Sequence, residues 1–157
     1  GWYANPGNLD YVISSQDLVG YISAAKGHVV VALNACNSGG FIAEAGGTLS
    51  GMNVTVLCSS QWGVGSGWYN GSSKLDFMSW GFTRAFGYNM TNGNALKYYA
   101  DKDGDGRITA LELADYNRYF TNLLARDYFG TAYFVGDNKP QEVQVLITDP
   151  NAVLYEP

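Results

Sequence analysis

The chain has 157 residues, a length that suits one domain with a sizeable core. Hydrophobic residues make up 46% of it and charged residues 15%, which excludes a disordered protein. The net charge of −5, with nine scattered basic residues, argues against a nucleic-acid partner, because phosphate binding needs clustered Lys and Arg. No stretch approaches the roughly 20 apolar residues of a membrane span.

Hydrophobic spacing predicts an alternation of helices and strands along the chain. The apolar run at 29–35 is rich in β-branched residues and lacks alternation, as expected of a parallel strand covered on both faces. Ser14 or Ser15 can cap the first helix, and Asp17 suits the positive end of its dipole. In chain order, the predicted elements are a short strand or extended arm at 9–13, a helix at 14–27, a strand at 29–35, a helix at 38–45, a strand at 54–58, a helix at 74–86, a helical lead-in at 95–100, a helix at 110–126 and a last strand at 143–147.

This alternation predicts an α/β fold in which helices cover both faces of a mainly parallel sheet, with residues 1–157 forming a single domain. In such sheets, active sites lie beyond the carboxyl ends of the strands. Cys36 and the Gly-, Ser- and Trp-rich loop at 59–73 both follow strand ends, so we expect them on the same side of the domain. Loops as long as this one are often functional.

Residues 101–112 (DKDGDGRITALE) match the twelve-residue calcium-binding loop of the EF-hand at every required position. Gly106 stands where that loop turns sharply, and hard oxygen ligands suit Ca²⁺ rather than Zn²⁺. A single loop of this kind favours a structural role, in which Ca²⁺ orders the start of the following helix. The alternative is an acidic turn without a metal. The predicted ligands are Asp101, Asp103, Asp105, the backbone carbonyl of Arg107, Thr109 and Glu112.

Cys36 lies where a predicted strand stops, and small residues follow it. Such residues let a substrate backbone approach and leave amide groups free to point at an oxyanion. A helix starting just beyond would help to hold a thiolate. These features indicate a nucleophile, against the alternative that Cys36 is a packed thiol, the commonest role of a free cysteine.

An apolar strand followed by Ala-Cys-x-Ser-Gly resembles the nucleophile motif of the caspase-like cysteine peptidases, which include caspases, metacaspases, legumain, clostripain and gingipains. The similarity continues, in the family's order, through residues 9–22, 54–60 and 77–87, and bacterial relatives also carry a DxDGDG loop. The resemblance implies a caspase-like fold and a cysteine endopeptidase with a Cys-His dyad. Asn34 departs from the pattern, since relatives usually have Asp or Glu two residues before the Cys.

Carried over to this chain, the resemblance makes Cys36 the nucleophile and its own amide a part of the oxyanion hole. The acid/base would be a His-Gly pair, and the substrate a peptide or protein. The cleaved residue stays open between Arg or Lys, Asp and Asn, and Asp76 is a candidate acidic wall. The candidate oxyanion and substrate-binding residues are Ser38, Gly39, Ser59, Ser60, Gln61, Trp62 and Trp68.

The expected histidine is missing from the chain. Its one histidine, His28, begins the strand whose end carries Cys36, so the two lie about 26 Å apart along the strand. A general base must come within about 3 Å of its proton, or act through one water. In the family, the histidine lies in the part that would precede Gly1. The resemblance therefore implies a His-bearing N-terminal chain of the same precursor, with the first strands absent here and a sheet edge left open. The alternative is that the sequence is truncated before its His-bearing part.

Two other functions remain open. The chain could be a non-catalytic, calcium-binding interaction module on the same fold, or another cysteine acyl-transfer enzyme. Cys58 is expected to be a packing residue that could pair with Cys36 under oxidation. The resemblance and the low charge imply a secreted or cell-surface bacterial protein.

Overall fold

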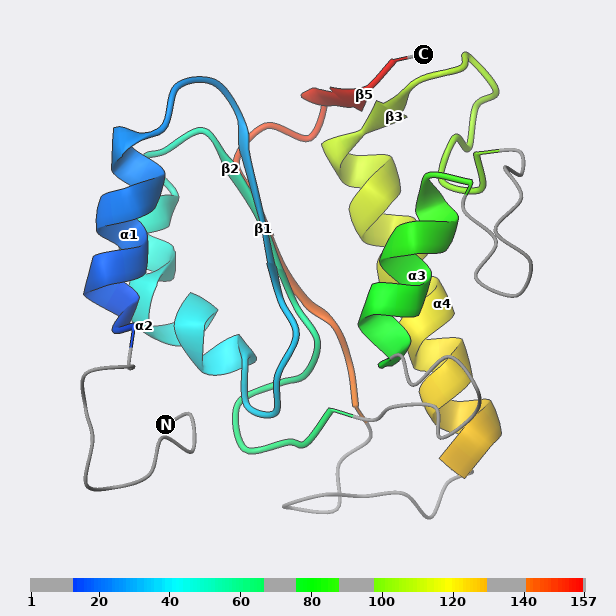
Figure 1. Cartoon of the computed structure of the whole chain (residues 1–157), viewed down its shortest axis with the longest axis horizontal. Helices are drawn as coiled ribbons and strands as arrows, with labels where there is room; N and C mark the ends of the chain where they lie inside the picture. The colour runs from blue at the N-terminus through cyan, green and yellow to red at the C-terminus, as the bar shows by residue number, and fades with distance from the viewer. Residues whose placement is uncertain (1–12, 67–75, 88–97, 130–140, 157) are drawn as a thin grey trace.

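The structure, a computed structural model, describes residues 13–66, 76–87, 98–129 and 141–156. Figure 1 shows three layers, with α1 and α2 on one face of the central sheet and α3 and α4 on the other, so the predicted α/β class is confirmed. No helix in these ranges is long and apolar enough to span a membrane. The elements are α1 (Ser15–Ala24), β1 (Val29–Leu33), α2 (Gly39–Leu49), β2 (Val54–Cys58), α3 (Phe77–Ala85), β3 (Ile108–Thr109), α4 (Ala110–Phe129), β4 (Gln144–Ile147) and β5 (Val153–Tyr155).

The central sheet has the strand order β1-β2-β4 and is mixed. β1 runs parallel to β2, from Val29 opposite Val54 to Leu33 opposite Cys58, whereas β4 runs antiparallel to β2. Two helices, α3 and α4, separate β2 from β4 and return the chain to the end at which β2 finished (Figure 1). The next strand must then run in the opposite direction. The prediction of a mainly parallel sheet is therefore not confirmed.

β2 is fully buried, and its alternating side chains build two cores. Val54, Val56 and Cys58 belong to the core under α1 and α2. Leu57 points the other way, into the core formed with α3 and α4. Because successive side chains of a strand point to opposite faces of the sheet, β2 contributes to the cores on both faces.

β1 is less covered than its apolar sequence predicts. Four of its residues are half-buried and Ala32 is exposed. Within the described residues, β2 is its sole strand partner, so β1 forms an edge of the sheet there. A strand of such apolar character at an edge is a ready template for another strand.

The helix starts follow local capping chemistry. Of the two candidate caps for α1, the structure selects Ser14, whose hydroxyl oxygen accepts a hydrogen bond from the Asp17 amide (3.1 Å), while the Asp17 carboxylate accepts one from the Ser14 amide (3.0 Å). Asp76 caps α3 by accepting from the Ser79 amide at 2.7 Å. α2 and α4 run further than predicted, to Leu49 and Phe129.

Two predictions about elements differ from the structure. Residues 98–100 are not helical, so the helical lead-in is wrong there; its remainder, 95–97, lies outside the described residues, as do 9–12 of the predicted arm. The strand at 143–147 is not the last one, because β5 follows it and pairs antiparallel with β3. Three residues are too few to give β5 a hydrophobic pattern of its own.

We predict opposite effects for two glycine substitutions in α2. A Cβ on Gly39 would lie 2.8 Å from the Ser60 carbonyl oxygen and 3.0 Å from the Gln61 Cα, both backbone atoms, whereas a Cβ on Gly47 meets nothing within 4 Å. Gly39→Ala should lower the free energy of unfolding by about 1–3 kcal/mol through overpacking. Gly47→Ala should raise it by up to about 1 kcal/mol through helix propensity. Equal effects in urea unfolding would contradict this packing.

Candidate functional site

Cys36 follows the carboxyl end of β1 and is exposed. Its sulfur accepts a hydrogen bond from the Ser66 amide at 3.3 Å, and the Ser66 hydroxyl lies 3.8 Å away. Asn37 has a left-handed backbone (φ 62°), which Asn tolerates better than most residues, and its amide donates to the Val64 carbonyl at 2.8 Å. The loop after β1 and the loop after β2 therefore meet around the thiol, as the sequence predicts.

Three predicted site residues, Ser38, Ser59 and Ser60, hold the two strand ends together. The Ser59 hydroxyl donates to the Ala35 carbonyl (3.0 Å) and accepts from the Ala35 amide (3.1 Å). The Ser60 hydroxyl also donates to the Ala35 carbonyl, at 3.3 Å, and the Ser38 hydroxyl accepts from the Ser60 amide, at 3.3 Å. All three side chains are buried. They hold the backbone next to Cys36 in place. Because they are buried, their side chains are not positioned to contact a substrate, contrary to the prediction.

The backbone amides after Cys36 are already hydrogen-bonded, which corrects the expectation that they are free. The Ser38 amide donates to the Ala35 carbonyl, the Gly39 amide to Ser60, and the Gly40 amide to Asn37. Among the described residues, the Cys36 amide has no such acceptor. It is therefore the amide of this loop that is available to an oxyanion.

Trp62 is 61% exposed beside this loop. Its indole ring lies directly against Gly40, where a Cβ would come within 1.8 Å of the ring atom Cε3. Trp62 is thus a large exposed side chain packed against the start of α2, and its contact with a substrate stays a prediction. Trp68, the other predicted aromatic contact, lies outside the described residues.

Two residues that the sequence analysis missed, Gln141 and Glu142, bind the residues that follow β2. Gln141 is buried, and its side-chain amide donates to the Ser59 carbonyl at 2.7 Å. The Glu142 backbone amide donates to the Gln61 side-chain oxygen at 2.9 Å. Gln61, a predicted substrate contact, is thus held by the segment that leads into β4. No sequence signal marks these contacts, because each spans about 80 residues of chain.

Asn34, which departs from the caspase-like pattern, joins β1 to α3. Its side-chain amide donates to the Ser79 hydroxyl at 2.9 Å. The Ser79 backbone amide in turn donates to Asp76, the residue that caps α3. Asn34 therefore places a neutral polar group two residues before Cys36, where a carboxylate would carry a charge.

His28 lies at the opposite end of β1 from Cys36. One ring nitrogen, Nδ1, is 2.6 Å from the Asn53 side-chain oxygen, and Nε2 is 2.8 Å from the Thr55 hydroxyl. Both nitrogens are therefore occupied by local partners at the start of the sheet. Since His28 is the one histidine among these 157 residues, they do not supply the base of the predicted Cys-His dyad.

The second candidate site is the loop that leads into α4. One carboxylate oxygen from each of Asp101, Asp103 and Asp105 lies within 4.8 Å of the others, an arrangement that could hold a metal ion. Gly104 and Gly106 have positive φ angles of 79° and 87°, which let the loop curl around these oxygens. The donor set is all oxygen, which suits a hard cation.

Glu112, the predicted closing ligand, is held at the start of α4. Its carboxylate accepts from the Lys102 amide (3.0 Å), the Thr109 amide (3.0 Å) and the Thr109 hydroxyl (2.9 Å). Burial by itself raises the pKa of Glu112, but these hydrogen bonds outweigh it and hold the pKa below its ordinary value. Glu112 is thus charged and directed at the loop, although it is not among the three converging carboxylates.

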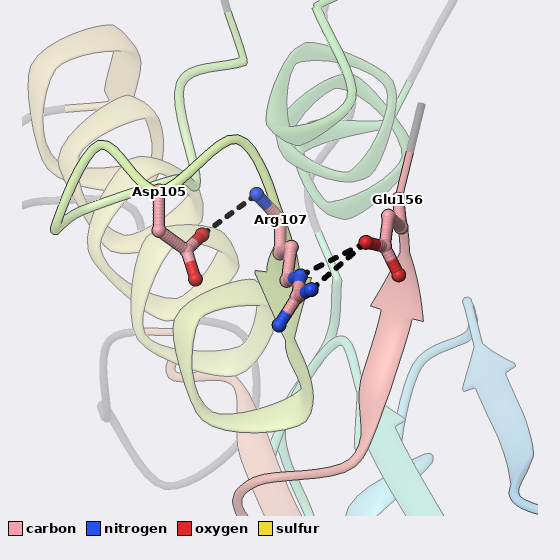
Figure 2. A network of polar contacts seen from close by, with 3 residues as sticks. All are labelled: Asp105, Arg107 and Glu156. Atoms are coloured by element: carbon pink, nitrogen blue, oxygen red, sulfur yellow. Dashed lines mark hydrogen bonds and ion pairs between the residues drawn. The ribbon is translucent and has the colours of Figure 1, made fainter.

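Arg107, whose backbone carbonyl is a predicted ligand, is fixed on two sides (Figure 2). Its amide donates to the Asp105 carboxylate at 2.7 Å. Its guanidinium forms an ion pair with Glu156 near the carboxyl end of the chain, at 2.9 Å.

No protein-family model, curated protein or solved structure matches the chain. The assignment of function therefore rests on the geometry of these two sites.

We predict that the two cysteines differ sharply in reactivity. Burial raises the pKa of the Cys58 thiol to about 12, so its thiolate is scarce at neutral pH, whereas Cys36 is exposed. In the native protein at pH 8, iodoacetamide should modify one cysteine, with peptide mapping placing the label on Cys36. Cys36→Ser should abolish native labelling, and unfolding should then expose Cys58. Equal native labelling of both cysteines would contradict the structure.

Proposed function

We propose that this chain is the Cys-bearing part of a caspase-like cysteine endopeptidase. The proposal is supported chiefly by one observation: an exposed thiol at the carboxyl end of β1, beside its own backbone amide, which donates to no acceptor among the described residues. A structural cysteine is usually buried, as Cys58 is.

The described residues account for part of the reaction. The Cys36 thiolate would attack the peptide carbonyl, and the developing oxyanion would accept a hydrogen bond from the Cys36 amide. α2 begins three residues later, at Gly39, and its positive end favours negative charge at the site. Deprotonation of the thiol and protonation of the leaving amine require an acid/base group. Among the described residues, His28 does not fill this role, because its ring nitrogens lie against Asn53 and Thr55 at the other end of β1.

We assign that group to a second polypeptide, the His-bearing N-terminal chain of the same precursor. β1 is apolar, lies at an edge within the described sheet, and carries Cys36 at its end. A strand added there would end beside the thiol, where a histidine could act on it. With that strand, the mixed three-stranded sheet would extend toward a caspase-like sandwich.

We further propose that the loop at 101–112 binds Ca²⁺ as a structural ion. Three converging carboxylates repel one another, and a divalent cation would offset that repulsion at the start of α4. Asp101, Asp103, Asp105, Thr109, Glu112 and the Arg107 carbonyl would hold it. A secreted or cell-surface location, where Ca²⁺ is plentiful, fits this role.

The alternative is a non-catalytic calcium-binding interaction module on the same fold. It is favoured by the distance of His28 from Cys36 and by the hydrogen bonds that occupy both of its ring nitrogens. The two functions make different predictions for Cys36.

The peptidase proposal predicts that Cys36→Ala abolishes peptide hydrolysis by protein isolated with its natural partner, because the nucleophile is lost. Cys58→Ala should keep the activity, with lower stability from the cavity that it leaves. Initial rates on a mixed peptide library, read by mass spectrometry, measure both. Undiminished hydrolysis by Cys36→Ala would refute the catalytic role, and binding of an intact protein without cleavage would favour the interaction module.

The calcium proposal predicts that Ca²⁺ at a hundredfold excess over its Kd stabilises the protein by about 2.7 kcal/mol. Asp101→Asn and Asp103→Asn should each weaken this effect, because each removes a charged ligand. Asp115→Asn, an exposed change on α4 outside the loop, is the matched control. Calorimetric titration and thermal unfolding check this, and a wild-type protein indifferent to Ca²⁺ would contradict it.

A further inference from the structure

The C-terminal strand β5 is built onto the loop at 101–112. β5 pairs antiparallel with β3, placing Tyr155 opposite Ile108 and Val153 opposite Thr109. Just before β5, the Ala152 and Pro150 carbonyls accept hydrogen bonds from the first two amides of α4, Ala110 at 2.9 Å and Leu111 at 3.1 Å. The last residues of the chain therefore cap the helix that the loop begins.

The contact continues on the outer side of the loop. Arg107 and Glu156 form their ion pair there, with side chains 48% and 57% exposed (Figure 2). Together with Asp105 and Gly106, they line a shallow pocket. Beneath it, Tyr155 packs against the core that contains the fully buried Ile108. β5 thus fixes the backbone of residues 107–109, which would supply two of the ligands.

We propose that β5 is the closing partner of the calcium loop, in the place where EF-hand sensors usually set a second loop. This inference rests on the proposed Ca²⁺ site. Cation binding and docking of β5 then form one coupled equilibrium: the ion orders residues 107–109, and the ordered residues hold β5. Because coupling is reciprocal, the factor by which β5 docking raises Ca²⁺ affinity equals the factor by which Ca²⁺ favours docking.

Two single substitutions separate coupling from simple electrostatics. Arg107→Gln removes a positive charge near the ligands, and Glu156→Gln removes a negative one. Charge alone would make Arg107→Gln bind Ca²⁺ more tightly and Glu156→Gln less tightly. If docking of β5 matters, both should bind less tightly, because both break the same ion pair. We expect a two- to fivefold loss for each, about the worth of an exposed ion pair.

The measurement is calorimetric Ca²⁺ titration of the full chain, with amide hydrogen exchange of residues 152–156 followed with and without Ca²⁺. Asp127→Asn, which breaks the exposed Arg126–Asp127 pair far along α4, is the matched control and should change neither quantity. The exchanged pair Arg107→Glu with Glu156→Arg should recover part of the affinity.

The outcomes distinguish the two proposals. Weaker binding in both single variants, with Ca²⁺-dependent protection of residues 152–156, supports the coupling. If the two variants change Ca²⁺ affinity in opposite directions, or if Ca²⁺ does not change the hydrogen exchange of residues 152–156, the coupling is refuted while the Ca²⁺ site stands. If the wild-type chain binds no Ca²⁺ and the loop variant Asp103→Asn changes nothing, both proposals fail.

Discussion

The hydrogen bonds that join Ala35 to the end of β2 determine the geometry of the candidate active site. Ser59 binds both the amide and the carbonyl of Ala35, and Ser60 binds the same carbonyl. With these polar groups paired, the two parallel strands end at the same level and the next residue, Cys36, is left exposed. Buried polar groups without such partners would cost several kcal/mol, so the arrangement is strongly specified.

The two candidate sites are connected through the segments on either side of β4 and through α4. The segment entering β4 binds the end of β2 through Gln141 and the Ser59 carbonyl, and the segment leaving β4 continues into β5, which pairs with β3 in the loop at 101–112. α4 begins at that loop, and its Asn122 accepts a hydrogen bond from the Val143 amide, just before β4. Order at the loop can therefore contribute to order at the site, although they lie at opposite ends of the domain (Figure 1).

Much of this structure follows from local sequence. β2 occurs at its predicted residues, Ser14 caps α1, and the spacing of Asp101, Asp103 and Asp105 brings their carboxylates together. Features that depend on contacts between distant parts of the chain could not be predicted from local sequence. The antiparallel direction of β4 depends on two helices lying between it and β2, and β5 is too short to carry a pattern. The role of Gln141 depends on a contact across 82 residues, which local periodicity does not encode.

The proposed function makes Cys36 a nucleophile whose general base is supplied by a second polypeptide. Native mass spectrometry of the protein, isolated from its source without denaturation, tests this most directly. We expect the polypeptide that contains these 157 residues to form a one-to-one complex with a second, His-containing polypeptide. The chain appearing alone at its own mass would contradict the two-chain dyad.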